Sequence, residues 1–209
     1  MYKLPHFIEK DTDNVIAFMK ENAFAIITGL GEQYPVATHI PLEVVVKAND
    51  KILLCGHIMK NSDHHKAFVK NSNILVIFNG PHCYVSASWY SNPQSASTWN
   101  YMTVHVKGNI VFTDDEGTYA AIKAITNKYE GTETKAAFNE MSKEYIDQML
   151  KAIIGFTITV ATFDNVFKLS QNKSEAEQIN IIEQLKKTAD NDSINVALEM
   201  EKRIGTNKV

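Results

Sequence analysis

Arginine is almost absent from this chain of 209 residues, since Arg203 is the only one among its 21 basic side chains. The formal net charge is −3, from those 21 residues against 24 Asp and Glu. Proteins that clamp nucleic acids usually present a basic face, and guanine readout favours a bidentate arginine. The composition therefore disfavours direct DNA binding. Any bound phosphate would be held by lysine, histidine, hydroxyl or backbone groups.

Cysteine is also scarce, with Cys55 and Cys83 as the only two. Their spacing matches no disulfide framework, so reduced thiols are favoured, although a bridge between them stays open. The N-terminus lacks the apolar core of a signal peptide, and no apolar run approaches the roughly 20 residues that a membrane span needs. We therefore expect a soluble, cytoplasmic protein without membrane contact.

Short strand-like runs separated by turn residues dominate the chain. Turns are expected at 29–31, at Asn79-Gly80-Pro81 and at Asp164-Asn165. The expected strands are Phe24–Thr28, Tyr34–Leu42, Val44–Val46, Ile52–Ile58, Ile74–Phe78, Cys83–Ala87, Tyr101–Phe112, Phe156–Phe163 and Val166–Leu169.

Helices with capping residues lie between and after these runs. Most early connections are too short for the crossovers of a wound parallel sheet. The fold class expected is therefore mainly β, an antiparallel barrel in residues 1–170, with peripheral helices and a helical appendage in residues 171–209 packed on it. The expected helices cover residues 11–22, 62–68, 113–129, 142–154, 174–187 and 193–203.

The segment 55–66 ends an apolar strand, makes a polar turn and starts a helix. A helix start exposes N–H groups and the positive end of the dipole, so anions bind there. Lys60, Asn61 and Ser62 add donors, which suits a phosphate. The alternative is a capped surface helix with solvated lysines.

Three histidines in the same segment raise the question of a metal site. His57, His64 and His65 are close in sequence, but no zinc-type ligand spacing accompanies them. Adjacent helical residues point about 100° apart, so His64 and His65 do not easily share an ion. We expect no metal, and we expect Cys55 to be a buried, inert thiol.

Two further segments, 79–90 and 97–108, place aromatic residues beside hydroxyl and amide groups at strand ends. Such groups suit a planar ligand with polar edges, or a dimer interface rich in Trp and Tyr. Ordinary core packing explains them equally well. The segment 167–174 repeats the layout of 55–66, with a strand, a lysine-containing turn and a helix start. The alternative interpretation is a simple helix cap at Ser174.

Taken together and in order, these motifs resemble the PaiB family along nearly the whole chain. Members of that family are described as FMN-binding, negative transcriptional regulators of the split-barrel flavoprotein type. The motifs that carry the resemblance are Ala37-Thr38-His39-Ile40-Pro41-Leu42, Gly56-His57, Phe78-Asn79-Gly80-Pro81-His82, Ser88-Trp89-Tyr90, Thr98-Trp99-Asn100-Tyr101, His105-Val106-Lys107-Gly108 and Lys168-Leu169-Ser170-Gln171-Asn172-Lys173.

The resemblance implies a six-stranded split barrel that forms a homodimer and binds FMN at the subunit interface. By analogy, the flavin ring meets the strand that contains Thr38, His39 and Ile40. The phosphate is held by the turn that contains His57, Lys60, Asn61 and Ser62. Residues of the second subunit close the site, and these are Trp99, Asn100, Lys168 and Gln171.

The chain departs from the family pattern at the expected phosphate turn. Where relatives often carry Arg-x-Asn-Pro, this chain has Lys60-Asn61-Ser62-Asp63. Asp63 thereby places a carboxylate near the expected phosphate, and charge repulsion there would weaken binding.

Three functions are compatible with the resemblance. The first is a flavin-binding regulator that acts through a partner protein or DNA. The second is an FMN-dependent oxidoreductase acting on an unknown small molecule, for which His39 and His82 are candidate acid–base groups. The third is a haem-handling split barrel, which is disfavoured because related haem-degrading proteins use a histidine in the C-terminal tail and the last histidine here is His105.

Overall fold

The computed structural model describes residues 1, 3–92 and 94–205 of the chain. These residues form two compact units. The first unit comprises Met1–Phe18, Asn79–Val104 and Asp164–Val209, and the second comprises Met19–Phe78 and His105–Phe163. Neither unit is a continuous piece of the chain.

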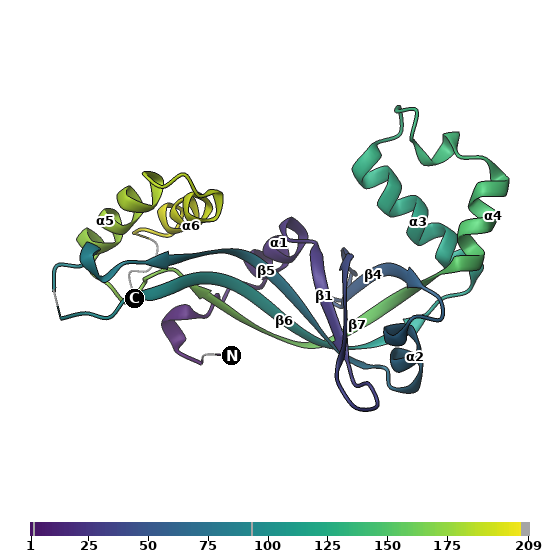
Figure 1. Cartoon of the computed structure of the whole chain (residues 1–209), viewed down its shortest axis with the longest axis horizontal. Coiled ribbons are helices and arrows are strands. Elements are labelled where there is room, and N and C mark those ends of the chain that lie inside the picture. The colour runs from purple at the N-terminus through teal and green to yellow at the C-terminus, as the bar shows by residue number, and fades with distance from the viewer. Residues whose placement is uncertain (2, 93, 206–209) are drawn as a thin grey trace. The chain divides into compact units, whose positions relative to one another are not determined.

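The described residues form one antiparallel sheet, several strands of which are labelled in Figure 1. It has seven strands, one more than the resemblance implies, in the order β2-β1-β5-β6-β7-β4-β3. The pairings of β1 with β2 and β5, and of β4 with β3 and β7, are antiparallel. The predicted fold class is confirmed. The strands are β1 (Phe24–Gly29), β2 (Val36–Pro41), β3 (Glu43–Val46), β4 (Ile52–Met59), β5 (Asn73–Val85), β6 (Thr98–Phe112) and β7 (Ile153–Lys168).

The six α-helices of the described residues begin and end close to the predicted residues, because their capping groups are local in sequence. Ser62, Asp114, Ser142, Ser174 and Asp190 each accept a hydrogen bond from a backbone N–H of the first turn that follows. The helices are α1 (Thr12–Glu21), α2 (Asp63–Lys70), α3 (Asp115–Glu130), α4 (Lys143–Ala152), α5 (Glu175–Lys186) and α6 (Asn191–Glu201).

The turn predicted at Asn79-Gly80-Pro81 is wrong, because β5 runs through it without a break. Gly80 is required there by a close approach and not by a turn. A Cβ atom at Gly80 would lie 2.5 Å from Cε2 of Phe18, which is closer than carbon atoms can pack. The glycine therefore makes room for a buried phenylalanine ring against the strand.

The turn predicted at Asp164-Asn165 is also wrong, since β7 continues to Lys168. The buried Asn165 side chain pairs with the backbone of Glu9 in both directions. Its Oδ1 accepts from Glu9 N at 2.8 Å, and its Nδ2 donates to Glu9 O at 3.0 Å. The asparagine thus imitates a strand partner for the N-terminal segment.

Each unit has its own apolar core. In the second unit the inward residues of alternating strands meet, and fully buried members include Ile27, Leu54, Val76, Phe156 and Ile158. In the first unit α5 and α6 pack against each other, and its buried residues include Phe18, Val85, Phe167, Ile181, Leu185 and Val196.

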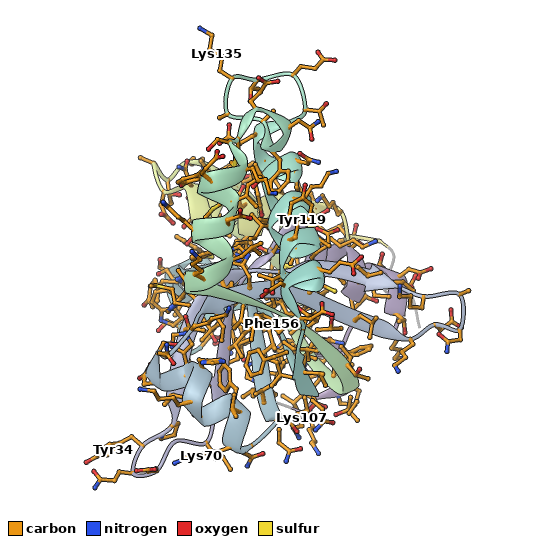
Figure 2. The ribbon with its side chains drawn as sticks, turned by 90° about the vertical axis from the view of Figure 1, so that its right-hand side faces the viewer. Tyr34, Lys70, Lys107, Tyr119, Lys135 and Phe156 are labelled. Atoms are coloured by element: carbon orange, nitrogen blue, oxygen red, sulfur yellow. The ribbon has the colours of Figure 1, made fainter. Side chains whose placement is uncertain are left out.

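A smaller cluster supports the helical hairpin that the second unit inserts between β6 and β7. Its buried members are Ile122 of α3, Ile146 of α4, and Phe138 from the segment between the two helices. The ring of Tyr119 meets that of Phe138 edge to face, with centroids 5.1 Å apart. This packing holds α3 and α4 together. Figure 2 shows the two helices side by side, with Tyr119 on α3.

Candidate functional site

A cavity of about 320 Å³ lies in the second unit between α3 and the outer face of β3, β4 and β7. The room for it comes from α3, which presents only small side chains at Gly117, Ala120, Ala121 and Ala124. Figure 2 shows Phe156 of β7, which also lines the cavity, at the end of α3 nearest the sheet. The other lining residues are Pro41, Glu43, Val45, Cys55, Gly56, His57, Thr113, Ile125 and Thr157.

Gly56 brings the end of β2 against β4 at the edge of this cavity. A Cβ atom at this position would lie 2.9 Å from Cζ of Phe156, 3.1 Å from Cδ2 of Leu42 and 3.4 Å from the carbonyl oxygen of Pro41. The absence of a side chain therefore permits the close approach. As a result Pro41, which follows the predicted ring-binding segment, and His57, from the predicted phosphate segment, line the same cavity.

The side chain of His57 is half-buried, and this burial lowers its pKa below the usual 6.5. The imidazole is therefore neutral near pH 7, with one N–H donor and one nitrogen acceptor. Within the described part of the chain, no group hydrogen-bonds to this ring. His57 thus offers a ligand in the cavity one polar contact of either kind.

The rest of the cavity is apolar or weakly polar. Cys55 is half-buried, and its Sγ lies 3.9 Å from Oγ1 of Thr157. Sequence reasoning expected this thiol to be buried and inert, but the alternation of β4 turns it toward the cavity. Glu43 is the charged residue of the lining, and its carboxylate pairs with Lys128 Nζ at 2.9 Å. Such a lining suits a planar, uncharged ring system with few polar edges.

The segment predicted to meet the flavin ring lies on β2, at one end of the strand order of the described sheet. Ile40 is buried, Thr38 is half-buried and His39 is exposed. The His39 ring lies 6.1 Å from that of Phe24, between centroids, on the neighbouring strand β1. The backbone of this edge strand is the part that a ring could contact.

The predicted phosphate turn is held by contacts within the chain. Lys60 Nζ donates to the carbonyl oxygen of Leu150 at 2.8 Å, and Lys60 N donates to that of Ala152 at 2.8 Å. Both acceptors lie in the last turn of α4, where carbonyl groups have no partner within the helix. Lys60 therefore caps the negative end of α4.

The two residues after Lys60 are also engaged. Asn61 adopts a left-handed backbone with φ of 65°, and its N–H donates to Nδ1 of His65 at 3.1 Å. The Ser62 hydroxyl donates to Met59 O at 2.9 Å and accepts from His65 N at 3.2 Å. These contacts form the helix cap that was the alternative to a phosphate site.

Trp99 belongs to an exposed aromatic group in the first unit. Its side chain is 55% exposed. Its ring stacks on that of His82 at 6.2 Å and 29°, and Tyr84 meets it edge on at 6.2 Å. Asn79, Tyr101 and their neighbours border an adjoining hollow of about 330 Å³. This surface is open to a planar ligand or to another protein chain.

The other predicted residues of the first unit bond to their own neighbours. Asn100 is fully buried and bonds to Ser170. Lys168 donates to the Thr98 hydroxyl, and burial lowers its pKa. Gln171 spans its own turn, since Oε1 accepts from Leu169 N at 2.7 Å and Nε2 donates to the carbonyl of Phe167. Their predicted roles toward a cofactor stay predictions.

Sequence reasoning missed the contribution of α3. The signal was the spacing of Gly117, Ala120, Ala121 and Ala124, which places four small residues on one face of a helix.

Two other expectations concern absences. Among residues 1, 3–92 and 94–205, no three His, Cys, Asp or Glu side chains gather as metal ligands, and no helix has the length and apolarity to cross a bilayer.

The fold is a split barrel, which is the class of the solved structures that the chain is similar to. The FAD and haem binding protein of Mycobacterium smegmatis is 14% identical, over 82% of this chain and 78% of that chain, with a TM-score of 0.59. The flavocytochrome Anf3 of Azotobacter vinelandii is 12% identical, over 80% of this chain and 72% of that chain, with a TM-score of 0.56.

Within that class the chain belongs to the PaiB family. Residues 1–162 match the family described as "Putative FMN-binding domain". The chain is also 30% identical over 205 residues to the protease synthase and sporulation protein PAI 2 of Bacillus subtilis (strain 168), covering 98% of both chains. The predicted family is confirmed, and FMN is the cofactor named for it.

Proposed function

We propose that this chain is a homodimeric flavin-binding protein whose isoalloxazine ring lies at the cavity beneath α3. The single observation that carries the proposal is that Pro41 and His57 line one cavity. The end of β2 and the end of β4 belong to two motifs that the family resemblance links to the same cofactor. The two ends meet at a cavity of about 320 Å³, a volume in the range of small-molecule sites.

The chemistry of the lining fits the ring of FMN. The neutral imidazole of His57 and the hydroxyl of Thr157 supply polar contacts, while the small side chains of α3 leave space for a flat group. When bound, FMN would supply hydride or electron transfer at its ring. The chain's own contribution is to hold that ring beside the edge strand β2 and to exclude water with Phe156 and Val45.

A second copy of the chain is proposed to cover the outer face of β1 and β5. Phe24 is 66% exposed on this face, and Ile26, Leu75 and Ile77 are only half-buried. The antiparallel pairing aligns Ile26 with Ile77 and Thr28 with Leu75, so these side chains form one apolar surface. Apolar surfaces of this kind usually mark interfaces between chains.

A regulatory role is proposed to work through a protein partner and not through DNA contacts. The sole arginine pairs with Glu199 at 2.5 Å, so its guanidinium is already engaged. The exposed Trp99, His82 and Tyr84 offer an aromatic surface for such a partner. The Bacillus subtilis relative carries sporulation in its name, which is consistent with a regulatory role.

Titration of flavin against the purified protein tests whether the ring binds in this cavity. Ala121→Leu adds a branched side chain to the lining and should weaken flavin binding by about 10-fold or more, since overpacking such a space costs on the order of 1–3 kcal/mol. Ala17→Leu, on an exposed position of α1, is the matched control and should bind like wild type. Equal affinity in all three proteins would place the ring elsewhere.

Light scattering at micromolar concentration, with FMN present, tests whether the chain forms a dimer. Wild type should have the mass of a dimer, and Leu75→Glu should have the mass of a monomer, because a carboxylate in the apolar face would lose its water on association. A monomeric wild type would rule out the homodimer.

A further inference from the structure

We infer that the site selects the uncharged ring of a flavin and not its phosphate, because this chain closes the expected phosphate turn with its own groups. The inference rests on the proposed function, since it concerns how the same cavity recognises its ligand. It departs from the residue assignments that the family resemblance implies for Lys60, Asn61 and Ser62.

The first argument is the cation. Lys60 is the one lysine of the turn, and its ammonium bonds to the carbonyl of Leu150 at 2.8 Å. Its backbone N–H holds the carbonyl of Ala152 at the same distance. A phosphate that recruited Lys60 would therefore leave the last turn of α4 without its cap. The cost of that loss offsets what the ion pair contributes.

The second argument is the set of donors. The N–H of Asn61 donates to His65, the hydroxyl of Ser62 donates to Met59, and the N–H of His65 donates to Ser62. The N–H of Lys66 donates to the Ser62 carbonyl at 3.1 Å as the first bond of α2. A phosphate would have to displace several of these bonds together to reach the helix start.

The third argument is charge. The exposed Asp63 carboxylate sits in the first turn of α2, where its Oδ1 accepts from His64 N at 2.7 Å. This backbone hydrogen bond and the one from the His64 side chain hold the pKa of Asp63 below its usual value, so the group is ionised. It occupies the place at the positive end of the helix that an anion would take.

The histidines around the turn do not reverse this balance. Burial lowers the pKa of His57. Burial, followed by the charges of His64, Lys60 and Lys66, also lowers the pKa of His65. Both rings are therefore neutral at pH 7, and Lys66 lies on an exposed position beyond the turn. A phosphate dianion at this turn would therefore lie near the Asp63 carboxylate. Among the described residues of the turn, the one lysine, Lys60, is already bonded to Leu150.

Parallel titrations with FMN and riboflavin at pH 7.5 and low salt test the inference. Wild type should bind the two ligands with dissociation constants within about threefold of each other. Asp63→Asn should tighten FMN binding by about threefold or more and leave riboflavin unchanged, because it removes the resident anion. Lys60→Met should change the two affinities alike, and Lys66→Met, the matched control, should change neither.

Hydrogen exchange gives a second readout for Lys60. Lys60→Met should raise exchange in the last turn of α4 without ligand, whereas Lys66→Met should not. A wild type that binds FMN 10-fold more tightly than riboflavin, with the preference lost in Lys60→Met, would overturn the inference and leave flavin binding intact. A wild type that binds neither flavin would overturn the proposed function and this inference with it.

Discussion

The Ser170 hydroxyl hydrogen-bonds to both the nitrogen and the oxygen of the Asn100 side-chain amide, 70 positions away in the sequence. Nδ2 of Asn100 donates to the Ser170 hydroxyl at 2.9 Å, and that hydroxyl lies 3.2 Å from Oδ1. Ser170 has a left-handed backbone with φ of 61°, which is unfavourable for a serine and needs support from its surroundings. The asparagine therefore fixes the turn that follows β7 and carries Gln171.

Asn100→Ala should destabilise the protein by about 3 kcal/mol, because the buried Ser170 hydroxyl loses its partner and a cavity forms. Urea denaturation measures the change. Asn109→Ala, which removes an exposed amide contact to Asn73, is the control and should cost less than about 0.5 kcal/mol. Similar costs for the two variants would show that the turn does not depend on Asn100.

The half-buried imidazole of His57 should make stability depend on pH. Its folded pKa is lowered by burial, so the unfolded chain takes up the proton first. The stability that neutral His57 contributes is complete above about pH 6.5 and is lost as the pH falls below that value, at up to about 1.4 kcal/mol per pH unit. His57→Gln should therefore show a smaller loss between pH 7.5 and 5.5 than wild type. His82→Gln, at an exposed histidine, is the comparison, and an unchanged slope in His57→Gln would contradict the assignment.

The two thiols should differ in reactivity. Burial, and next the Asp190 carboxylate, raise the pKa of Cys83 to about 12, so at pH 8 only about one thiol in 10,000 is ionised. Cys55 is half-buried in the cavity lining and should be alkylated first by iodoacetamide, as peptide mass spectrometry would show. Bound FMN should slow that reaction. Native protein labelled mainly at Cys83 would refute the prediction.

Binding to duplex DNA should be weak and without sequence preference at 150 mM salt. The net charge is −3 and the single arginine is engaged, so few counterions can be released on binding. Fluorescence anisotropy with labelled duplexes, with and without FMN, measures this. Saturable, sequence-specific binding in the nanomolar range would mean that the chain reads DNA directly.

The elements that could be predicted from the sequence are those whose causes are local. The cap at Ser62 bonds only three residues away, and the capping box of Ser174 and Glu177 is equally short in range. The strand breaks were mispredicted because their causes are remote. Gly80 leaves space for the ring of Phe18. Asn165 hydrogen-bonds to the backbone of Glu9, which is 156 positions earlier in the chain.

The candidate site shows the same limit. The residue types of the turn at Lys60 indicate an anion site, because donors and a cation stand at a helix start. The partner of Lys60 is a carbonyl oxygen 90 residues later, which no local pattern reveals. Likewise, the alanines of α3 look like ordinary helix formers, and only the packing of α3 on β4 leaves the space that makes them part of a cavity.

The strands β5, β6 and β7 each begin in one compact unit and end in the other without interruption. No peptide cut from this chain can therefore contain a whole unit and omit the other. Partial unfolding of one unit would have to break strands that the other still holds, which favours a single cooperative melting transition. Recombination or proteolysis at a single peptide bond therefore cannot separate the two units, because each of these three strands belongs to both.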